Sequence, residues 1–289
     1  MNRYILLLAI VLISSSYQAT EPNLIIGSFN IQTLGPTKMS RPEFVETVCR
    51  ILSKYDIIAI QEIRDSSTNM AVINTLVSKL NEYVLSKGIN YNFVISPRLG
   101  QGTHKEIYAY VYRTKTNGSL RKIQVVKQMV HDDIEMVYDR PPFIAEFKVL
   151  DTSLSIKEFT LMNLHLRPTA VFIESLGLRK VVDRYRAGSV KNIAILGDFN
   201  IDCSYISTSD RQSVALTLND FTWYIRDRYA TTISTSNCAY DRILVNTAVF
   251  KNAIVTNSNM TYRYDLEFGM NMTEVSKISD HYPVEIKLF

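Results

Sequence analysis

A short apolar segment that ends in polar or ionisable residues recurs six times along this chain, and this feature most constrains the fold. The clearest copy closes the sequence, where Asp280 and His281 stand just before the alternating strand predicted at 284–288. The other copies end at Asn30, Gln61-Glu62, His165, Asp198-Phe199-Asn200 and Asp241-Arg242. Strand ends that gather carboxylates, amides and two histidines are typical of a metal-assisted hydrolytic site.

The hydrophobic pattern alternates strands and helices. Apolar runs predict strands at 24–31, 57–62, 91–96, 107–113, 123–130, 143–149, 159–165, 192–197, 242–245 and 284–288. Apolar residues at helical spacing predict helices at 40–54, 70–86 and 170–185, the first one capped by Ser40 with Glu43 completing a capping box. This mixed order excludes a simple doubly wound sheet and predicts an α/β (α+β) fold, with two packed sheets and helices outside.

The N-terminus has the pattern of a secretory signal peptide. Arg3 precedes the apolar run 5–13, and small and polar residues lead to Ala19. The run is short for a membrane span, although a retained anchor or a first core strand are the alternatives. We therefore expect a signal peptide at 1–19 and a single secreted domain at 20–289, with no membrane association after cleavage.

A secretory route permits disulfides and N-glycosylation. A bond between Cys203 and Cys238 would join two loops that carry candidate site residues, whereas Cys49 lies on a helical stripe and is expected to be a buried thiol. The acceptor triplets begin at Asn117, Asn259 and Asn271. The formal net charge of +4 does not by itself indicate a nucleic-acid partner.

Three carboxylates at the strand ends, Glu62, Asp198 and Asp280, are hard oxygen donors of the kind that hold Mg²⁺, Mn²⁺ or Ca²⁺. The chain has no His-x-x-x-His or Cys-x-x-Cys spacing, which disfavours zinc. Each residue alone has a structural alternative: Asp198 could shape a turn, and Glu62 could pair with Arg64. The joint pattern favours metal-assisted cleavage of a phosphodiester and leaves the substrate open.

Two histidines could move the protons that such a cleavage requires. A carboxylate that accepts one imidazole N–H fixes the tautomer and raises the pKa of His165 or His281 toward neutrality. Asn30 and Asn200 could donate amide hydrogens to phosphate oxygens without adding charge. Taken alone, His165 after an apolar strand could equally be a core histidine.

At this point the sequence resembles the secreted deoxyribonuclease I family, from residue 26 to residue 288. The matching stretches are 28–31, 55–58, 61–66, 105–106, 164–165, 197–205, 237–242 and 278–284. The two most specific blocks read Gly-Asp-Phe-Asn-x-x-Cys-Ser-Tyr from Gly197 and Cys-Ala-Tyr-Asp-Arg from Cys238.

The resemblance implies a four-layer sandwich and a divalent-cation-dependent endonuclease. Such an enzyme hydrolyses double-stranded DNA with low sequence specificity and leaves 5′-phosphate ends. The implied cofactor is Mg²⁺ (or Mn²⁺) at the active site, and Ca²⁺ is also expected. The implied disulfide joins Cys203 to Cys238.

The resemblance also assigns residues by matching position. His165 and His281 become the acid/base pair, oriented by Glu106 and Asp241. Metal or phosphate positions fall on Glu62, Asp198 and Asp280. Substrate contacts fall on Asn30, Arg64, His104, Arg140, Asn200, Tyr205 and Tyr240, with Arg64 matching the arginine that enters the minor groove.

Some positions depart from the family pattern. His104 stands where the family has a tyrosine that stacks on a deoxyribose. A Ca²⁺-binding aspartate is replaced by Ala230, although Thr232, Ser234 and Ser236 remain, and Asp132 with Asp133 could serve another Ca²⁺. Pro97-Arg98 replaces an acidic residue at the actin-contact edge, so actin binding is not carried over, and we expect a monomer.

Two other functions remain open at this stage. One is a related phosphodiesterase or phosphatase that acts on a lipid or inositol phosphate. The other is a non-catalytic secreted DNA-binding paralogue, which would be expected to have lost a histidine or an acid. None is lost here, and fold alone does not choose among these functions.

Overall fold

The structure is a computed structural model that describes residues 24–102, 105–115, 123–150, 154–187 and 191–289. The predicted signal peptide at 1–19, His104 and Asn117 lie outside the described residues.

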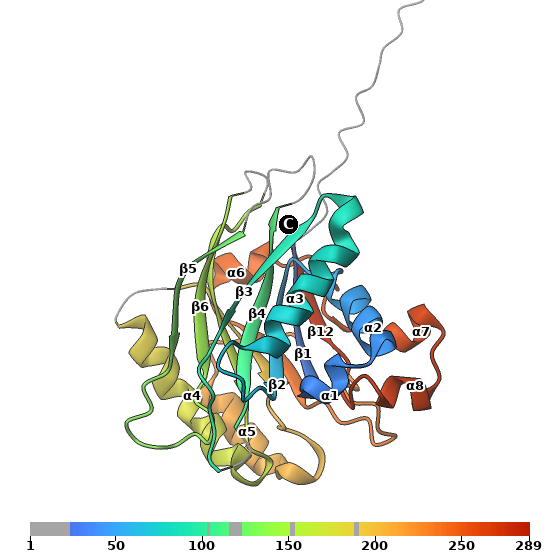
Figure 1. Ribbon diagram of the computed structural model, residues 1–289. Helices are drawn as coiled ribbons and strands as arrows, with labels where there is room; N and C mark the ends of the chain where they lie inside the picture. Colours follow the sequence, from blue (N-terminus) through green and yellow to red (C-terminus); the bar gives the residue numbers. More distant parts are fainter. Residues whose placement is uncertain (1–23, 103–104, 116–122, 151–153, 188–190) are drawn as a thin grey trace, which may run out of the picture.

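Two six-stranded mixed sheets form the centre of the molecule (Figure 1). The first sheet has the order β11-β12-β1-β2-β4-β3, built from Met260–Thr261, Val284–Leu288, Leu24–Leu34, Ile57–Ile63, Ile107–Lys115 and Asn90–Ile95. The second has the order β5-β6-β7-β8-β10-β9, built from Ile123–Val130, Phe143–Val149, Glu158–His165, Ile193–Asp198, Asp241–Val245 and Thr222–Trp223. Among the described residues, each sheet has one parallel pair of strands, β1 with β2 and β7 with β8.

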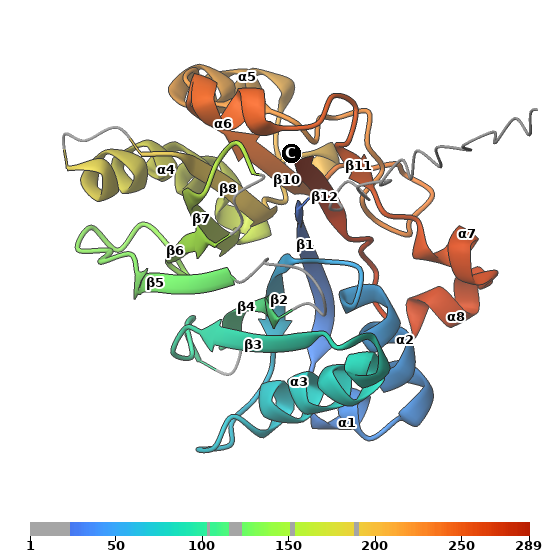
Figure 2. The ribbon, with the colours of Figure 1, turned by 90° about the horizontal axis from the view of Figure 1, so that it is seen from above.

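Helices cover the outer face of each sheet, as Figure 2 shows from above. The first sheet carries α1 (Pro36–Met39), α2 (Pro42–Leu52) and α3 (Ala71–Val84), and the second carries α4 (Val171–Arg186) and α5 (Thr208–Thr217). The remaining helices are α6 (Ala248–Ala253), α7 (Tyr264–Phe268) and α8 (Met272–Ser276), with 3-10 turns η1 (Leu85–Lys87), η2 (Pro168–Ala170) and η3 (Cys203–Tyr205). One apolar core lies between the sheets, and one lies between each sheet and its helices. This arrangement confirms the four-layer sandwich.

The ten predicted strands are present. The cap predicted for the helix at 40–54, which the structure shows as α2, is wrong. Helix α2 begins at Pro42 after Arg41, whose side chain makes no capping hydrogen bond. Ser40 instead ends α1 and donates its hydroxyl to the Thr37 carbonyl. A proline at the first helical position needs no cap for its missing N–H, so the helix begins without the capping box.

A buried polar clasp joins the two sheets directly beneath the strand ends that carry Glu62 and His165. The Gln61 side chain donates to Asn163 Oδ1 at 2.6 Å and to Ser28 Oγ at 3.0 Å. Asn163 in turn donates to the carbonyls of Ile60 and Ala109, each at 3.2 Å. Because the buried hydrogen bonds of Asn163 connect the two sheets, the clasp helps to set how the ends of β2 and β7 face each other.

Candidate active site

A cleft of about 310 Å³ opens where the strand ends of the two sheets meet. Eight residues expected from the sequence line it: Glu62, His165, Asp198, Asn200, Tyr205, Tyr240, Asp280 and His281. Larger cavities occur elsewhere, at about 360 Å³ and 520 Å³, but neither has a histidine in its wall. The donor chemistry therefore identifies the smaller cleft as the candidate active site.

Two histidine–carboxylate pairs face each other across this cleft. His165 Nδ1 lies 2.9 Å from Glu106 Oε1, and His281 Nδ1 lies 2.7 Å from Asp241 Oδ2. The two Nε2 atoms lie 3.5 Å and 3.6 Å from the same Asp198 Oδ2. A carboxylate on Nδ1 holds the proton there in the neutral ring, so Nε2 is the atom left to exchange protons in the cleft.

The carboxylates around the two imidazoles favour their protonated forms. Burial alone would lower the pKa of His281, but Asp241 and Asp198 outweigh burial and raise that pKa to about 10. The pKa of His165 is likewise raised, because Glu106 and Asp198 outweigh its burial. Burial raises the pKa of Asp198, against the opposing effect of the two histidines. The cleft therefore holds protons tightly at neutral pH.

Glu62 adds a carboxylate to the cleft wall near the end of β2, and Asn30, within the neighbouring strand β1, hydrogen-bonds to it without lining the cleft itself. Asn30 Nδ2 donates to Glu62 Oε1 at 3.1 Å and to Asp198 Oδ2 at 3.0 Å. Burial would raise the pKa of Glu62, but the charge of His165 and hydrogen bonds from Asn30 and the Thr33 N–H lower it below its usual range. Glu62 also has φ of 62°, in the left-handed region that a glutamate rarely adopts. Such strain is characteristic of functional positions, and it aims an ionised carboxylate at the cleft.

The turn after β8 places Asp198 in the middle of the site. Gly197 has φ of 142°, and an added Cβ there would lie 2.0 Å from the Leu164 carbonyl oxygen, so only glycine fits. Asp198 Oδ1 accepts from the Asn200 N–H at 3.0 Å, and Asn200 Nδ2 donates to the Leu166 carbonyl at 2.9 Å. The tetrapeptide that the sequence singled out is therefore both a turn and part of the cleft wall.

The residues present fit a hard divalent cation. Asp198, Asp241 and His281 bring potential ligand atoms within 4.8 Å of one another. Buried carboxylate oxygens of Asp241 and Asp280 have no hydrogen-bond donor among the described residues. Asp241 is already engaged by His281, which leaves Glu62, Asp198 and Asp280 as the acidic side chains that line the cleft around it. Oxygen-rich donors of this kind suit Mg²⁺, Mn²⁺ or Ca²⁺ better than zinc.

Two arginines expected to contact substrate lie behind His165. Arg140 is 6% exposed, and its Nε lies 3.3 Å from Glu106 Oε1 and donates to the His165 carbonyl at 3.2 Å. Arg64 Nη2 lies 3.8 Å from Glu106 Oε2. Both guanidiniums therefore support the carboxylate that orients His165, and neither is among the residues that line the cleft.

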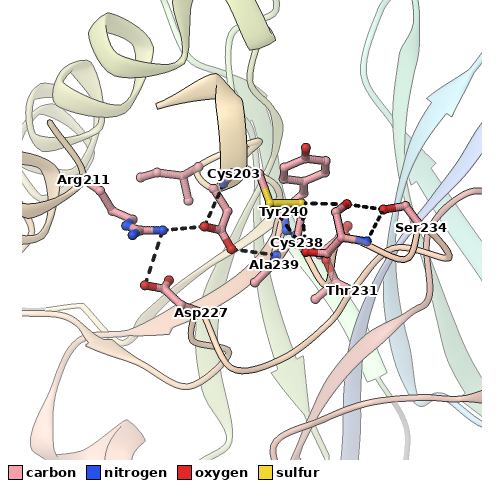
Figure 3. The surroundings of a disulfide bond; sticks show 12 residues. Cys203, Arg211, Asp227, Thr231, Ser234, Cys238, Ala239 and Tyr240 are labelled. Carbon is pink, nitrogen blue, oxygen red and sulfur yellow. Dashed lines mark hydrogen bonds and ion pairs between the residues drawn. A yellow bond between two sulfur atoms is a disulfide. The ribbon is translucent and has the colours of Figure 1, made fainter. Parts of the chain in front are cut away.

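The disulfide and its surroundings hold the rim of the cleft (Figure 3). Cys203 and Cys238 are bonded, as the resemblance implied, and Cys49 is a buried free thiol. The Tyr205 and Tyr240 rings that flank this bond lie 5.1 Å apart. Thr231 Oγ1 accepts from the N–H groups of Tyr240 and Asp241, each at 3.0 Å.

At both expected Ca²⁺ positions, 232–236 and 132–133, the side chains form hydrogen bonds within their own loops. Ser234 and Ser236 share a hydroxyl hydrogen bond near the cleft rim. The Asp133 carboxylate accepts from the N–H groups of Val137 and Tyr138 at 3.1 Å and 2.7 Å, so it closes its own loop. In the described ranges, no group of three metal-ligating residues includes Asp132 or Asp133.

Sequence reasoning missed Lys38, which joins strand β1 next to Asn30 to the segment that leads to His281. Its ammonium donates to the carbonyls of Ile31 at 3.1 Å and Ile278 at 2.7 Å, and burial lowers its pKa to about 8. Ser279 adds a second tie, donating to the Asn30 carbonyl at 2.6 Å. Only a fold that brings positions 38 and 278 together reveals this contact, so no local pattern could have found it.

Replacing Lys38 by methionine should loosen this connection. We expect Lys38→Met to lower the nicking rate at least about tenfold and the free energy of unfolding by about 1–3 kcal/mol, because buried carbonyls lose their donor. Plasmid nicking and urea unfolding measure the two effects. Lys79→Met, on the exposed face of α3, is the matched control. A Lys38→Met protein as active as the control would show that the connection does not position the site.

Comparisons with known proteins agree with this geometry. Residues 27–281 match the model of the Endonuclease/Exonuclease/phosphatase family. The chain is 35% identical to Deoxyribonuclease-1 of Sus scrofa, over 92% of both chains, and 35% identical to Deoxyribonuclease-1-like 2 of Mus musculus, over 90% of both. Among solved structures, it resembles a mannosyl-6-phosphatase of Bacteroides thetaiotaomicron, with a TM-score of 0.59 and 17% identity over 92% of this chain and 99% of that one. It also resembles D. rerio TDP2, complexed with a single-strand DNA product, with a TM-score of 0.58 and 15% identity over 93% of this chain and 100% of that one.

Proposed function

Because the chain belongs to the Endonuclease/Exonuclease/phosphatase family, and within it to the deoxyribonuclease I family, we propose that it is a divalent-metal-dependent endonuclease acting on double-stranded DNA. It cuts with low sequence specificity and leaves 5′-phosphate ends. The observation that carries this proposal is the approach of both imidazole Nε2 atoms, at 3.5 Å and 3.6 Å, to one Asp198 oxygen.

The two histidines divide the proton transfers of the reaction. One imidazole, after releasing its own Nε2 proton, accepts the proton of the attacking water, and the other, protonated at Nε2, donates that proton to the departing 3′ oxygen of deoxyribose. Glu106 and Asp241 hold the rings and stabilise their protonated forms through Nδ1. Asp198 lies between the two Nε2 atoms and keeps their exchangeable protons in the cleft.

Glu62, Asp198 and Asp280 are the residues that would hold the cation, Mg²⁺ or Mn²⁺. When bound, such an ion stabilises the negative charge that develops on the phosphoryl oxygens. Two observations on this chain support the assignment. The lowered pKa of Glu62 keeps its carboxylate ionised, and the side chains of Glu62, Asp198 and Asp280 all line the same cleft. Ca²⁺ is expected to contribute as well, without an assigned structural site.

DNA would be held by the side chains around the cleft. Asn200 would donate its remaining amide hydrogen to a phosphate oxygen, whereas Asn30 would have to exchange a hydrogen bond to Glu62 or Asp198 for one to phosphate. Tyr205, which is 43% exposed, presents its ring beside Tyr240 at the rim. Arg64 would enter the minor groove, where recognition depends on groove width more than on bases. Arg140, which is buried and paired with Glu106, would act on the DNA backbone only indirectly, by holding the carboxylate that orients His165. His104 would provide a further contact to a deoxyribose.

We further propose that the protein is secreted as a monomer after removal of residues 1–19, and that residues 20–289 act as one domain without actin binding. No helix in the described ranges is long and apolar enough to cross a membrane. Among the glycan-acceptor asparagines, Asn259 donates both amide hydrogens, to the Tyr224 carbonyl and the Tyr229 hydroxyl. Asn271 is exposed and caps α8 through its side-chain oxygen, which leaves its amide nitrogen available. Asn271 is thus better placed than Asn259 to carry a glycan, and Asn117 remains a third acceptor.

A nicking assay tests the proposed function directly. Purified protein is incubated with supercoiled plasmid under Mg²⁺, Mn²⁺ or Ca²⁺, and sphingomyelin and an inositol phosphate serve as competing substrates. We expect nicked DNA with 5′-phosphate ends, full loss of nicking in EDTA, no release of phosphocholine from sphingomyelin and no release of phosphate from the inositol phosphate. Nicking that persists in EDTA, or preference for either other substrate, would contradict the proposal.

Cation binding should release protons and strengthen with pH. The pKa of His281, raised from 6.5 to about 10, means that the folded chain carries this proton at neutral pH, and a cation beside it repels that proton. The same proton stabilises the fold fully below about pH 6.5, and this contribution is lost as pH rises through about 10. Calorimetric titration of Mg²⁺ at pH 6 and pH 8, in buffers of different ionisation enthalpy, measures the linkage. Affinity independent of pH would count against the assignment.

A further inference from the structure

A second cavity, of about 520 Å³, lies between α5, β9 and the segment 226–228. Six residues in its wall define what is here called the basic pocket: Arg211, Trp223, Arg226, Asp227, Arg228 and Arg242. None of them lines the catalytic cleft. Figure 3 shows Arg211 and Asp227 on one side of the disulfide and Ser234 on the other.

The basic pocket carries more positive charge than its carboxylates neutralise. Asp227 lies 2.8 Å from Arg242 Nη2 and 3.5 Å from Arg211 Nη1, and Asp202 pairs with the same two arginines. Two carboxylates are therefore shared by two of the four guanidiniums.

The other two arginines of the pocket have only neutral partners. Arg226 Nε donates to the Trp223 carbonyl at 3.0 Å, and Arg228 Nη2 donates to the Tyr229 hydroxyl at 3.2 Å. Both side chains are exposed, and neither has a carboxylate partner in the part of the chain that the structure describes. Four positive and two negative charges leave the pocket in need of an anion.

Two donors in the wall are also left without an acceptor. Arg242 is 1% exposed, and its Nε has no hydrogen-bond partner among the described residues. The buried Nε1 of Trp223 has none either. Burial lowers the pKa of Arg242, against the opposing effect of Asp227 and Asp202. Buried donors and a buried cation in this condition favour a further negative group nearby.

We propose that the basic pocket is a second anion site that binds a nucleoside monophosphate, separately from the catalytic cleft. Guanidiniums recognise phosphate through paired N–H donors, and exposed Arg226 and Arg228 are free to reach one. The volume is in the range of small-molecule pockets and exceeds what a lone phosphate fills. Trp223, whose ring lies 5.8 Å from the Arg242 guanidinium carbon, supplies an aromatic surface for a base.

The pocket also contacts the loop that supports the catalytic rim. Asp202, which pairs with Arg211, accepts from the N–H groups of Cys203 at 2.8 Å and Ala239 at 2.9 Å. These residues precede Tyr205 and Tyr240 in the chain. A ligand in the basic pocket would therefore be connected to the disulfide-linked rim through Arg211 and the Asp202 carboxylate.

The chain contains one tryptophan, so its fluorescence reports on this pocket alone. The full protein is titrated with dAMP in EDTA, with excitation at the red edge where tyrosine does not absorb. We expect a saturable change in Trp223 emission. Arg226→Ser/Arg228→Ser should weaken binding at least about tenfold, since two charge-assisted contacts are lost. Lys79→Ser/Lys87→Ser removes the same charge from an exposed region on α3 and η1 and should leave the affinity unchanged.

Further titrations separate the possible ligands. Inorganic phosphate and deoxyadenosine should each bind about tenfold or more weakly than dAMP, because each lacks half of the contacts. The proposal is overturned by an absent or linear response to dAMP, by equal weakening in both double variants, or by phosphate binding as tightly as dAMP. Because the readout involves no DNA cleavage, and the arginine variant should nick plasmid at the wild-type rate, this result stands apart from the test of the proposed function.

Discussion

Replacing either catalytic-cleft histidine by alanine should lower the rate of plasmid nicking by about 10³ to 10⁴ while leaving the protein folded. The effect is expected to be large because neither Nε2 atom has a substitute: they lie 3.5 Å and 3.6 Å from one oxygen of Asp198, and the described residues provide no third imidazole in the cleft wall. His165→Ala and His281→Ala are compared with wild type in initial rates of nicking under Mg²⁺.

His131 provides the matched control for these substitutions. It is nearly as buried, at 8% exposure, and packs against Tyr138 outside the cleft. His131→Ala should therefore affect stability but not nicking beyond about twofold. If His165→Ala or His281→Ala nicks as fast as His131→Ala, the acid/base assignment is wrong.

Removing the disulfide should produce the largest loss of stability. Cys203 and Cys238 are separated by 35 residues, and closing a loop of that length restricts the unfolded chain by about 4 kcal/mol. We expect Cys203→Ala/Cys238→Ala to lower the midpoint of thermal unfolding by roughly 10 °C. Urea unfolding gives the free energy directly.

The same variant should also lose activity, because the bond holds the loops of Tyr205 and Tyr240 together. Cys49→Ala is the control, since it removes a buried thiol and leaves the bridge intact. A double variant as stable as Cys49→Ala would show that the loops are held by hydrogen bonds to Asp202 and Thr231 alone.

Sequence patterns predicted the strands well because each buried strand is a continuous apolar run. The segment 192–197 is an example: every residue of β8, Ile193–Asp198, is buried. Helix α5 escaped notice because it buries only Val214 and has no apolar stripe to detect. The two-residue strands β9 and β11 exist only through pairing with β10 and β12, which no local signal encodes.

In the candidate site, too, local patterns identified some residues, whereas the contacts of others depend on remote parts of the chain. Glu62, Asp198 and His281 were found because each follows or precedes an apolar strand, and strand ends converge in this fold. Asp241 stood out as a strand end, but its pairing with His281, like that of Glu106 with His165, was assigned only through the family resemblance, and both distances depend on pairing between remote strands. Lys38 had no signal at all, because its partners are backbone carbonyls that lie 7 and 240 residues away.

The central claim is that His165 and His281 act as one unit around Asp198. The most direct measurement is the nicking rate of the His165→Ala/His281→Ala double variant beside the two single variants. If the pair acts as a unit, the first substitution already removes the activity that depends on both histidines. The double variant then nicks about as slowly as either single variant. A double variant whose loss equals the product of two independent losses would contradict the claim.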